Sequence, residues 1–380
     1  MSDARLTYRI AAIPGDGVGP EVVAAGRAAL EAAGSAFGFE IRWSDIAAGG
    51  NAIDAYGVAI RPEDVTRAGE HDAILLGAVG GPRWDDPTAK VRPEQCLFAL
   101  RGELQLYANL RPVTIHPGLV ASSPLKPELL AGVDLLIVRE LTGGIYFGER
   151  EEATGPPGER VARDTLPYTE AEIVRVVRLG FKLAQARRGR LTSVDKANVI
   201  ATSRLWRRIV DELKGEYPDV EVNHQLVDSC AMLLVKSPAW FDVVVTENLF
   251  GDILSDEASV LAGSLGMLPS ASLGERKTEH GTFGLYEPIH GSAPDIAGRG
   301  IANPVGTILS AAMLARWSLG REDVAAAIEG AVAAALDAGL RTADLAAPGQ
   351  DAASTTEMTE AIVGRIAITE AARATAAAPA

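Results

Sequence analysis

The chain of 380 residues is long enough for two domains, and 47% of its residues are hydrophobic, which excludes a largely disordered protein. Its 36 basic and 50 acidic residues leave a formal net charge of −14. This charge argues against nucleic acid as a partner, because phosphate binding needs clustered Lys and Arg. It does not exclude an anionic substrate, because a few buried arginines can reverse the local field.

The chain contains two cysteines, Cys96 and Cys230, which form no C-x-x-C motif and no disulfide framework. The first residues, MSDARLTYRI, contain no apolar signal segment, and no apolar run reaches membrane-spanning length. We therefore expect a cytoplasmic protein with no membrane partner.

In chain order, short apolar runs alternate with helical patterns. Strands are predicted at 8–13, 72–79, 134–140, 191–197 and 241–247. Helices are predicted at 20–33, 94–104, 169–187, 201–214, 252–263, 304–319 and 321–338. This alternation predicts an α/β fold with a largely parallel sheet.

The first strand leads into GDGVGPE, which superficially resembles a dinucleotide-binding loop. The spacing differs from G-x-G-x-x-G, because Gly15, Gly17 and Gly19 are followed directly by Pro20, a residue suited to the first turn of a helix. We interpret the segment as a tight strand-to-helix turn and expect any nucleotide site to lie elsewhere.

Two segments interrupt the alternation. The polar, Gly- and Pro-containing segment 147–169 is too long for an ordinary connection. It predicts either a protruding arm that pairs with another subunit or a solvated loop. The alanine-rich tail 371–380 is expected to be frayed.

The densest polar signal is TENLFGDILSDEAS, at 246–259. Asp252 and Asp256 are four residues apart at the start of a helical pattern, so they share one face, with Glu247 and Asn248 just before them. Carboxylates in this arrangement suit Mg²⁺ or Mn²⁺, and Asp228 is a candidate third ligand. Favourable placement of acids near a helix N-terminus is the alternative explanation.

The segment 92–112 predicts a mixed binding face. Glu94, Leu97, Phe98 and Arg101 fall on one helical stripe that could hold a ligand with an aliphatic end and a carboxylate end. Two further arginines, Arg111 and Arg139, lie at element ends. Three such arginines fit carboxylate recognition, although each alone is more often a surface ion pair.

Two other side chains could transfer protons. Lys196, in SVDKAN, lies at the end of a predicted strand and could act as a general base if it is desolvated or close to a metal. Tyr146, in TGGIYFGE, is a second candidate, although a single tyrosine most often has only a structural role in the core or at the surface.

The segment 286–304 is long and irregular, which is typical of functional loops. Its small residues allow close approach to a planar ligand. Asp295 could accept hydrogen bonds from a ribose diol and repel a 2′-phosphate, and His290 could contact an adenine.

Taken in order, these motifs resemble those of the isocitrate/isopropylmalate dehydrogenase family of β-decarboxylating dehydrogenases. The similarity runs from GDGVGPE near residue 15 to NPVGTILSAAM near residue 313. It includes GGPRWD, LYANLRP, VRELTGGIYFGE, SVDKANV, FGDILSDEASVLAGSLGMLPSASLG and EPIHGSAPDIAGRGIANP. The resemblance implies a two-domain α/β/α fold of this family's type, which is not a Rossmann fold.

The resemblance also implies roles for individual residues. NAD would contact Gly81, Glu94, His290, Gly291, Ser292, Ala293, Asp295 and Asn303, and Asp295 matches the position that selects NAD over NADP. The substrate would contact Glu94, Leu97, Phe98, Arg101, Arg111, Arg139 and Asp228, with the arginines as carboxylate clamps. Mg²⁺ or Mn²⁺ would bind Asp228, Asp252 and Asp256, while Tyr146 and Lys196 match the catalytic acid and base.

By the same resemblance, a cofactor-side domain would comprise 1–106 plus 263–380, and a substrate and dimerisation domain 107–262, with the arm near 147–169. The active unit would be a homodimer in which Lys196 and Asp228 come from the neighbouring subunit. The implied reaction is NAD-dependent oxidative decarboxylation of 3-isopropylmalate, a step of leucine biosynthesis.

The resemblance implies that substrate choice depends on the 94–101 helix and the 140–146 loop, as it does within the family. Isocitrate-type relatives place a serine and polar neighbours on that helix, whereas Leu97 and Phe98 here suit an isopropyl group. Phe98 stands where a leucine is expected and Cys96 where a small residue is expected, so Phe98 could narrow the aliphatic site. Sister activities on homoisocitrate, isocitrate or tartrate are the nearest alternative. A metal-dependent phosphoryl-transfer or hydrolytic enzyme and a silent scaffold are alternatives from other classes.

Overall fold

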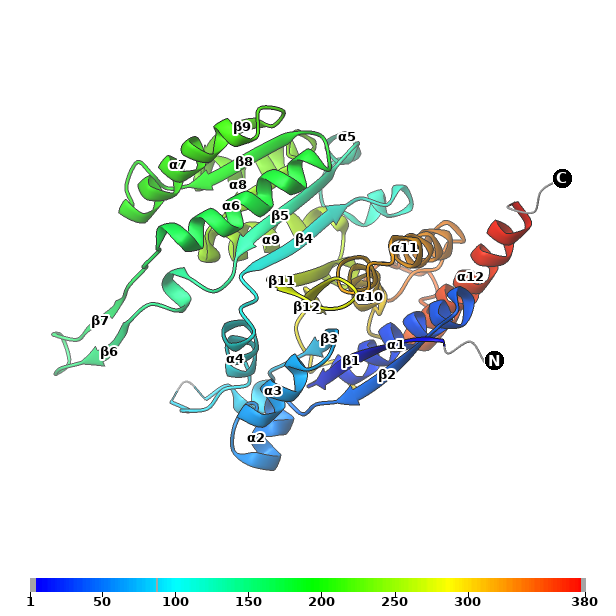
Figure 1. The fold of residues 1–380 in the computed structure, drawn as a ribbon. Helices are drawn as coiled ribbons and strands as arrows, with labels where there is room; N and C mark the ends of the chain where they lie inside the picture. The colour runs from blue at the N-terminus through cyan, green and yellow to red at the C-terminus, as the bar shows by residue number, and fades with distance from the viewer. Residues whose placement is uncertain (1–4, 87, 377–380) are drawn as a thin grey trace. The chain divides into compact units, whose positions relative to one another are not determined.

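The structure is a computed structural model that describes residues 5–86 and 88–376. The chain divides into two compact units. The first unit comprises Met1–Leu106, His116–Pro124 and Ala262–Ala380, and the second comprises Tyr107–Ile115 and Leu125–Leu261. Each unit is built around its own stretch of β-sheet with helices on both faces (Figure 1).

The strands of the first unit lie in the order β2-β1-β3-β12-β11. Their bounds are β1 Leu6–Gly15, β2 Phe39–Asp45, β3 Ala73–Ala78, β11 Pro269–Lys277 and β12 Thr282–Pro288. Only β11 runs antiparallel to its neighbour β12, and the other pairings are parallel. The helices are α1 Gly19–Phe37, α2 Gly50–Tyr56, α3 Pro62–Gly69, α4 Gln95–Glu103, α10 Val305–Trp317, α11 Glu322–Asp337 and α12 Thr355–Ala376.

Strand β3 shows how this sheet is buried. Ile74 and Leu76 point into a core cluster with the apolar faces of α3 and α4. Leu75, on the opposite face, contacts Gly26 of α1, and a Cβ at Gly26 would lie 3.1 Å from a Leu75 methyl group. Because successive strand side chains alternate between faces, continuous apolar runs of this kind mark a strand covered by helices on both sides.

In the second unit the order is β4-β5-β10-β8-β9, with β4 antiparallel to β5 and the remaining pairings parallel. The strands are β4 Ala108–Thr114, β5 Asp134–Glu140, β8 Arg190–Asp195, β9 Glu221–Leu226 and β10 Val243–Thr246. The helices are α5 Pro127–Leu130, α6 Glu170–Gln185, α7 Ala201–Leu213, α8 Val227–Lys236 and α9 Asn248–Ser259. Helices α6 and α7 pack together, as do α8 and α9.

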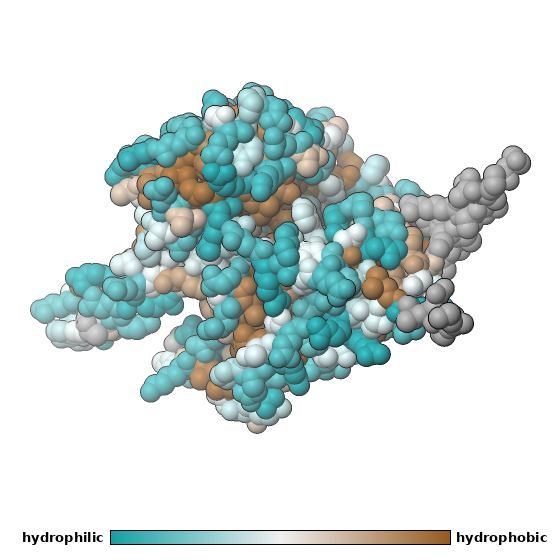
Figure 2. All heavy atoms as spheres, viewed as in Figure 1, coloured by the Kyte–Doolittle hydropathy of each residue, from teal (hydrophilic) through white to brown (hydrophobic). Residues whose placement is uncertain are grey.

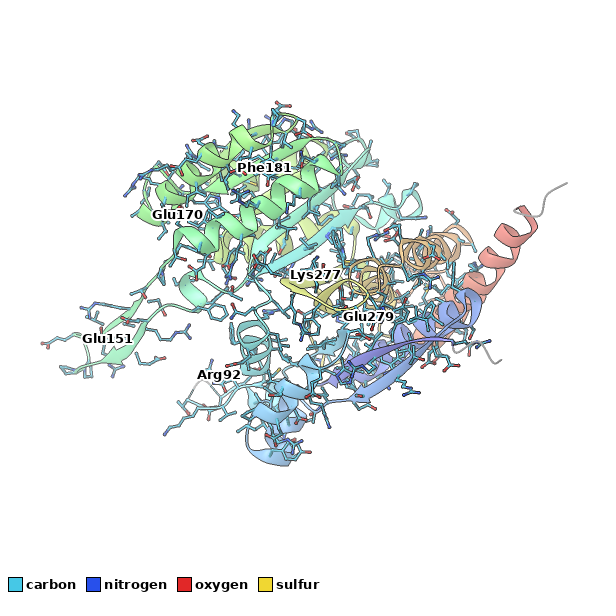
Figure 3. The ribbon with its side chains drawn as sticks, in the orientation of Figure 1. Arg92, Glu151, Glu170, Phe181, Lys277 and Glu279 are labelled. Atoms are coloured by element: carbon cyan, nitrogen blue, oxygen red, sulfur yellow. The ribbon has the colours of Figure 1, made fainter. Side chains whose placement is uncertain are left out.

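Helix α6 illustrates why these segments are helical. Thr169 and Glu172 form a reciprocal capping box at its start. Ile173, Val176 and Phe181 belong to its buried stripe, and Figure 3 labels Phe181 on this helix. The Phe181 ring stacks on Tyr217 with ring centroids 4.5 Å apart. Ile173, Val176 and Val177 have the spacing i, i+3, i+4, and Phe181 lies four residues after Val177, which places them on one face.

The segment 147–169 forms an antiparallel hairpin of β6 Arg150–Thr154 and β7 Val161–Asp164. This hairpin, which we call the arm, extends from the body of the second unit and is covered mainly by hydrophilic residues (Figure 2). Of the two alternatives for this segment, the structure shows a hairpin, and its pairing with another subunit stays a prediction.

The turn after β1 is sterically closed. Gly15 and Gly17 have φ of +72° and +59°, and a Cβ at Gly17 would lie 2.0 Å from the carbonyl oxygen of Ser292. The amide of Val18 donates to the same carbonyl at 2.8 Å. Protein backbone therefore fills the space that a pyrophosphate would need, which confirms the interpretation as a tight turn.

Each predicted strand and helix is found, with shifts at the ends. Helix α12 continues through Ala376, and 377–380 lie outside the described residues, so the predicted fraying of the tail stays a prediction. The expectation of a largely parallel sheet needs correction for β4 and β11, which pair antiparallel.

Candidate active site

Helix α9 begins earlier than its apolar pattern predicts. It starts at Asn248 rather than residue 252, directly after β10 and a single intervening residue, Glu247. Glu247 is the N-cap, and its carboxylate accepts hydrogen bonds from the amides of Leu249 at 3.1 Å and Phe250 at 2.7 Å. Asp252 therefore lies one turn inside the helix. Favourable placement at the helix N-terminus does not explain Asp252, since Glu247 already occupies that position.

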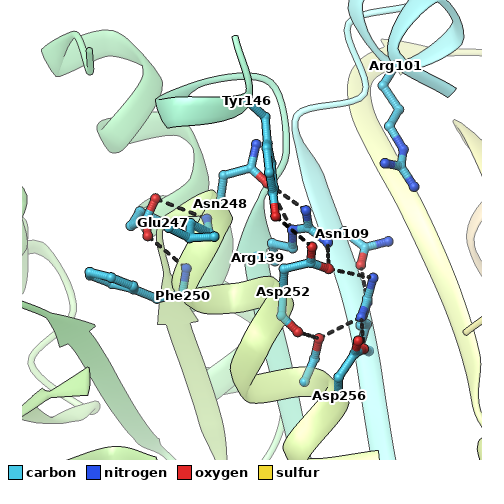
Figure 4. Close-up of polar contacts among 12 residues, drawn as sticks. Arg101, Asn109, Arg139, Tyr146, Glu247, Asn248, Phe250, Asp252 and Asp256 are labelled. Atoms are coloured by element: carbon cyan, nitrogen blue, oxygen red, sulfur yellow. Dashed lines mark hydrogen bonds and ion pairs between the residues drawn. The ribbon is translucent and has the colours of Figure 1, made fainter. Parts of the chain in front are cut away.

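Two arginines face this helix from neighbouring strands. Arg111 on β4 and Arg139 on β5 are 9% and 4% exposed, and the strand register places them on the same face of the sheet. Arg111 Nη1 lies 3.0 Å from Asp256 Oδ1, and Arg111 Nη2 lies 3.6 Å from Asp252 Oδ1. Arg139 Nη1 donates to Asp252 (Figure 4). We call Arg111, Arg139, Asp252 and Asp256 the arginine–aspartate cluster, whose formal charges cancel.

Tyr146 adds a proton donor to this cluster. It ends a short 3-10 turn, Gly144–Tyr146, and its hydroxyl donates to Asp252 Oδ2 at 3.0 Å (Figure 4). Burial, and then the negative charge of Asp252, raise the pKa of the phenol above its ordinary value. Tyr146 is therefore a neutral phenol at physiological pH, which is the form that can donate a proton.

Behind the cluster lies a buried polar layer that sequence reasoning missed in part. The hydroxyl of Tyr168 lies 3.1 Å from Glu140 and 3.5 Å from Glu247, and it accepts from the Asn248 amide at 3.0 Å. Burial raises the pKa of both carboxyls and of the phenol. Glu140 could have been suspected because it follows Arg139 at a strand end, whereas nothing in its local sequence distinguishes Tyr168.

Lys196 and Asp228 form a separate pair. The Lys196 ammonium lies 2.6 Å from Asp228 Oδ1, and the hydrogen bond lowers the pKa of that carboxyl. Among the described residues, no three His, Cys, Asp or Glu side chains are grouped so that they could hold a metal ion. Within one chain, Asp228 therefore does not complete a set with Asp252 and Asp256.

The remaining predicted substrate residues belong to the first unit. Arg101, 12% exposed at its side chain, forms an ion pair with Glu287 of β12 at 2.9 Å. The carboxylate of Glu94, just before α4, points at Gly80, where a Cβ would lie 3.0 Å from Glu94 Oε1. Glu287 is an acid that sequence reasoning did not single out, although it lies in the motif EPIHGSAPD.

The apolar residues of the predicted stripe on α4 differ in burial. Leu97 packs against the core cluster that also contains Cys96 and Leu100, both fully buried. Phe98 is 38% exposed. Burial raises the pKa of the Cys96 thiol to about 12, which identifies Cys96 as a core residue rather than a reactive one.

The segment 286–304 was expected to be irregular throughout, but residues 286–288 belong to β12. Residues 289–303 are irregular, and they differ in environment. Ser292 and Asn303 are buried, Gly291 and Asp295 are exposed, and Ala293 adopts φ of +40°. Ala293 packs with Val18 at the start of α1. His290 Nδ1 lies 2.8 Å from the Gly291 carbonyl, and burial lowers the pKa of the ring. His290 Nε2 is buried and has no hydrogen-bond partner in the described part of the chain.

Comparison with known proteins decides the family. The isocitrate/isopropylmalate dehydrogenase family matches residues 9–362. The chain belongs to this family. A 3-isopropylmalate dehydrogenase of Anaeromyxobacter dehalogenans is 55% identical over 95% of the chain and 100% of the relative. One of Moorella thermoacetica is 55% identical over 92% of the chain and 97% of the relative.

Solved structures of the family agree with the fold. The isocitrate dehydrogenase of Methylococcus capsulatus has a TM-score of 0.83 at 35% identity and covers 95% of this chain and 99% of its own. A β-decarboxylating dehydrogenase of Thermococcus kodakarensis has a TM-score of 0.75 at 38% identity, with 94% of this chain and 96% of its own covered. The predicted resemblance and fold type are confirmed.

Membership of this family makes the chain a dehydrogenase that acts on a small molecule, so the phosphoryl-transfer and scaffold hypotheses are wrong. The family implies use of a pyridine nucleotide and a divalent metal ion. Within the residues that the structure describes, none of the helices has the length and apolarity needed to cross a membrane.

Proposed function

We propose that the protein catalyses NAD-dependent oxidative decarboxylation of 3-isopropylmalate to 4-methyl-2-oxopentanoate and CO₂, a step of leucine biosynthesis. The observation that carries the proposal is the arginine–aspartate cluster with the Tyr146 hydroxyl on Asp252. It combines carboxylate-binding cations, oxygen ligands and a protonated phenol within one group of side chains. Relatives that are 51–55% identical over nearly the whole chain are named for this activity.

The donor set fits a divalent cation. Asp252 and Asp256 are one helical turn apart and offer only oxygen ligands, as Mg²⁺ and Mn²⁺ prefer. Asp256 is 63% exposed at its side chain, so a cation can reach it. Their present partners are arginines, whose Nη groups would bind the substrate carboxylates when the cation takes the aspartates. We assign Asp228 of a neighbouring subunit as the third ligand.

The first unit fits a nicotinamide dinucleotide. Burial lowers the pKa of His290 and favours the neutral ring, which donates from Nδ1 to the Gly291 carbonyl. Its buried Nε2, which has no partner among the described residues, can therefore accept a hydrogen bond from the cofactor. Gly81, Glu94, Gly291, Ser292, Ala293 and Asn303 would complete the site. The exposed carboxylate of Asp295 would accept from a ribose diol and repel a 2′-phosphate, which favours NAD over NADP.

The side chains have distinct tasks in this proposal. Bound NAD⁺ would supply the hydride acceptor, and a bound divalent ion a Lewis acid for the substrate oxygens. Arg101, Arg111 and Arg139 would hold the substrate carboxylates. Lys196, which the neighbouring subunit would supply, would accept the proton of the C2 hydroxyl. After CO₂ leaves, Tyr146 would donate its proton to the carbon that lost the carboxylate.

The preference for an isopropyl group rests on α4. Leu97 and Phe98 present apolar surface where isocitrate-type relatives place a serine, so a third substrate carboxylate would find no partner there. Homoisocitrate, isocitrate and tartrate remain the alternative substrates. The first unit is proposed as the cofactor-side domain and the second as the substrate and dimerisation domain.

A homodimer with shared active sites is supported by two features of the second unit. Met232 and Val235 of α8 and Ile253 of α9 are large apolar side chains that are 67%, 45% and 58% exposed in the isolated chain. The two helices pack against each other, so these residues suit a covered interface. In addition, Asp228 does not join Asp252 and Asp256 within one chain.

A cytoplasmic location is also part of the proposal. The two cysteines, Cys96 and Cys230, are free thiols and buried, which fits a reducing compartment such as the cytoplasm.

Measuring NADH formation at 340 nm tests the reaction. Purified protein with Mg²⁺ and NAD⁺ is offered isopropylmalate, isocitrate, homoisocitrate and tartrate in parallel, with NADP⁺ as the cofactor control. We expect turnover of isopropylmalate that is lost on adding EDTA. Turnover of another acid in its place would overturn the substrate assignment and leave the reaction type intact.

Hybrid dimers test the shared site. Lys196→Met and Tyr146→Phe chains carrying different tags are co-expressed, and doubly tagged hybrids are purified. If Lys196 serves the partner's site, each hybrid contains one site with both residues and regains about half of wild-type activity. Hybrids as inactive as the two parents would show that Lys196 and Tyr146 of one chain act together.

A further inference from the structure

Asn248 makes an unusual set of contacts behind the arginine–aspartate cluster. Its side-chain oxygen accepts from both Nε and Nη2 of Arg139, at 2.9 and 2.8 Å. Its side-chain nitrogen donates to the carbonyl of Gly143 at 2.9 Å, and Figure 4 shows Asn248 beside Arg139. Arginine can only donate and a carbonyl can only accept, so these partners fix the orientation of the amide.

This arrangement determines how the guanidinium of Arg139 points. Two of its three nitrogens are held by Asn248, which leaves Nη1 directed at Asp252. The stem of Arg139 is held as well, because a Cβ at Gly251 of α9 would lie 2.7 Å from Arg139 Cγ. The head of Arg139 therefore has one orientation, imposed by the first residue of α9.

Asn248 also connects Arg139 to the proton donor. Gly143 lies three residues before Tyr146, in the same 141–146 loop. One amide side chain thus holds the arginine with its oxygen and the tyrosine-bearing loop with its nitrogen. The backbone amide of Asn248 donates to Tyr168, which anchors the residue from behind.

Helix capping does not account for this side chain. Glu247 is the N-cap of α9 and accepts from the amides of Leu249 and Phe250. Asn248 is 1% exposed, and its side chain makes its polar contacts with Arg139 and Gly143 instead of with the backbone of the helix. Burying an amide in this way is unfavourable unless its hydrogen bonds are made, so the site depends on this geometry.

We propose that Asn248 is a positioning residue that orients Arg139 toward a substrate carboxylate and holds the Tyr146 loop in register with it. The proposal rests on the function above, in which Arg139 binds substrate. Asn248 is buried behind Arg139, so in this proposal it acts on substrate binding through Arg139 and on the proton donor through Gly143.

Asn248→Leu tests this, because leucine has a similar size and neither accepts nor donates. Loss of hydrogen bonds to a charged group should raise the KM for isopropylmalate by roughly tenfold to a hundredfold and leave the KM for NAD⁺ within about twofold. Asn248→Ser is the second variant, smaller and more easily folded. Asn223→Ser, on the exposed side of edge strand β9 where the asparagine accepts from Gln225, is the matched control.

A double-mutant cycle separates positioning from general damage. In an Arg139→Ala background, Asn248→Leu should change the KM for isopropylmalate by less than about threefold, since the carboxylate-binding group that Asn248 orients is already gone. Equal losses in both backgrounds, or an unchanged substrate KM in folded Asn248→Leu and Asn248→Ser proteins, would overturn the proposal. Wild-type protein that fails to oxidise isopropylmalate would instead overturn the proposed function.

Discussion

Binding of a divalent cation and binding of the substrate should each tighten the other, because the cation binds the two aspartates and the substrate binds the two arginines of one cluster. In the arginine–aspartate cluster, two positive and two negative groups already cancel. A cation alone leaves this cluster with excess positive charge, and a dianionic substrate alone leaves it with excess negative charge. The two ligands together restore neutrality and give each arginine and each aspartate a new partner.

The size of this coupling follows from the distances and the exposure. Unit charges about 5 Å apart interact by about 3 kcal/mol at the effective dielectric of a protein surface. The side chains of Asp252 and Asp256 are 33% and 63% exposed, so solvent screens part of this interaction. We therefore expect a coupling of about 1.5 kcal/mol, equivalent to about a tenfold change in affinity.

Calorimetric titration of Mn²⁺ without nucleotide measures the coupling, since no turnover occurs. The Kd for Mn²⁺ is determined with and without saturating isopropylmalate, corrected for Mn²⁺ chelation by the free acid. The Kd for isopropylmalate is then determined with and without Mn²⁺, and linkage requires the same factor in both directions. Equal affinities in the presence and absence of the partner ligand, or mutual weakening, would refute the charge argument. Asp256→Asn should weaken Mn²⁺ binding and reduce the coupling.

Four further outcomes follow from single side chains. Tyr146→Phe should lower kcat by at least about a hundredfold with little change in substrate KM, and a smaller loss would argue against its role as proton donor. Phe98→Leu should leave the melting temperature nearly unchanged, because Phe98 is 38% exposed, and should shift kcat/KM about threefold or more toward a malate with a longer alkyl chain. An unchanged selectivity would place the alkyl group elsewhere. Asp295→Ala should reduce the preference for NAD over NADP by roughly tenfold, measured as the ratio of kcat/KM values, and an unaltered ratio would remove Asp295 from the ribose site. Burial raises the pKa of Cys96 and of Cys230 to about 12, so at pH 8 only about one thiol in ten thousand is ionised; both thiols should resist a disulfide reagent until the protein is denatured, and fast labelling of native protein would contradict their burial.

Elements with a strong apolar pattern could be predicted, and those with a polar sequence could not. Strands such as 72–79 are continuous apolar runs, whereas β11 contains Ser270 and Ser272, which are nevertheless buried. The Ser270 hydroxyl donates to the Glu287 carbonyl, a partner contributed by β12. Since a buried serine becomes acceptable only through such a partner, its burial cannot be inferred from local sequence.

The first residue of a helix is also difficult to predict from local sequence. The apolar spacing of α9 suggested a start at residue 252, but the helix starts at Asn248 because Glu247 caps it. An acid before an apolar run is a weak signal, since glutamate is not a preferred cap. The shift changes the interpretation of Asp252 from a helix-end acid to a side chain one turn inside.

By itself, the sequence determined the α/β class, the order of the motifs and the pairing of Asp252 with Asp256 on one helical face, because these depend on short-range periodicity. Only the tertiary structure decided that Arg111 and Arg139 lie on one face of a sheet and contact these aspartates of α9. It also decided that Glu140, Tyr168 and Glu247 meet behind the cluster. Tyr168 lies 28 residues from Glu140 and 79 from Glu247 along the chain. Contacts over such separations depend on how strands and helices pack, and periodicity along one element contains no record of that packing.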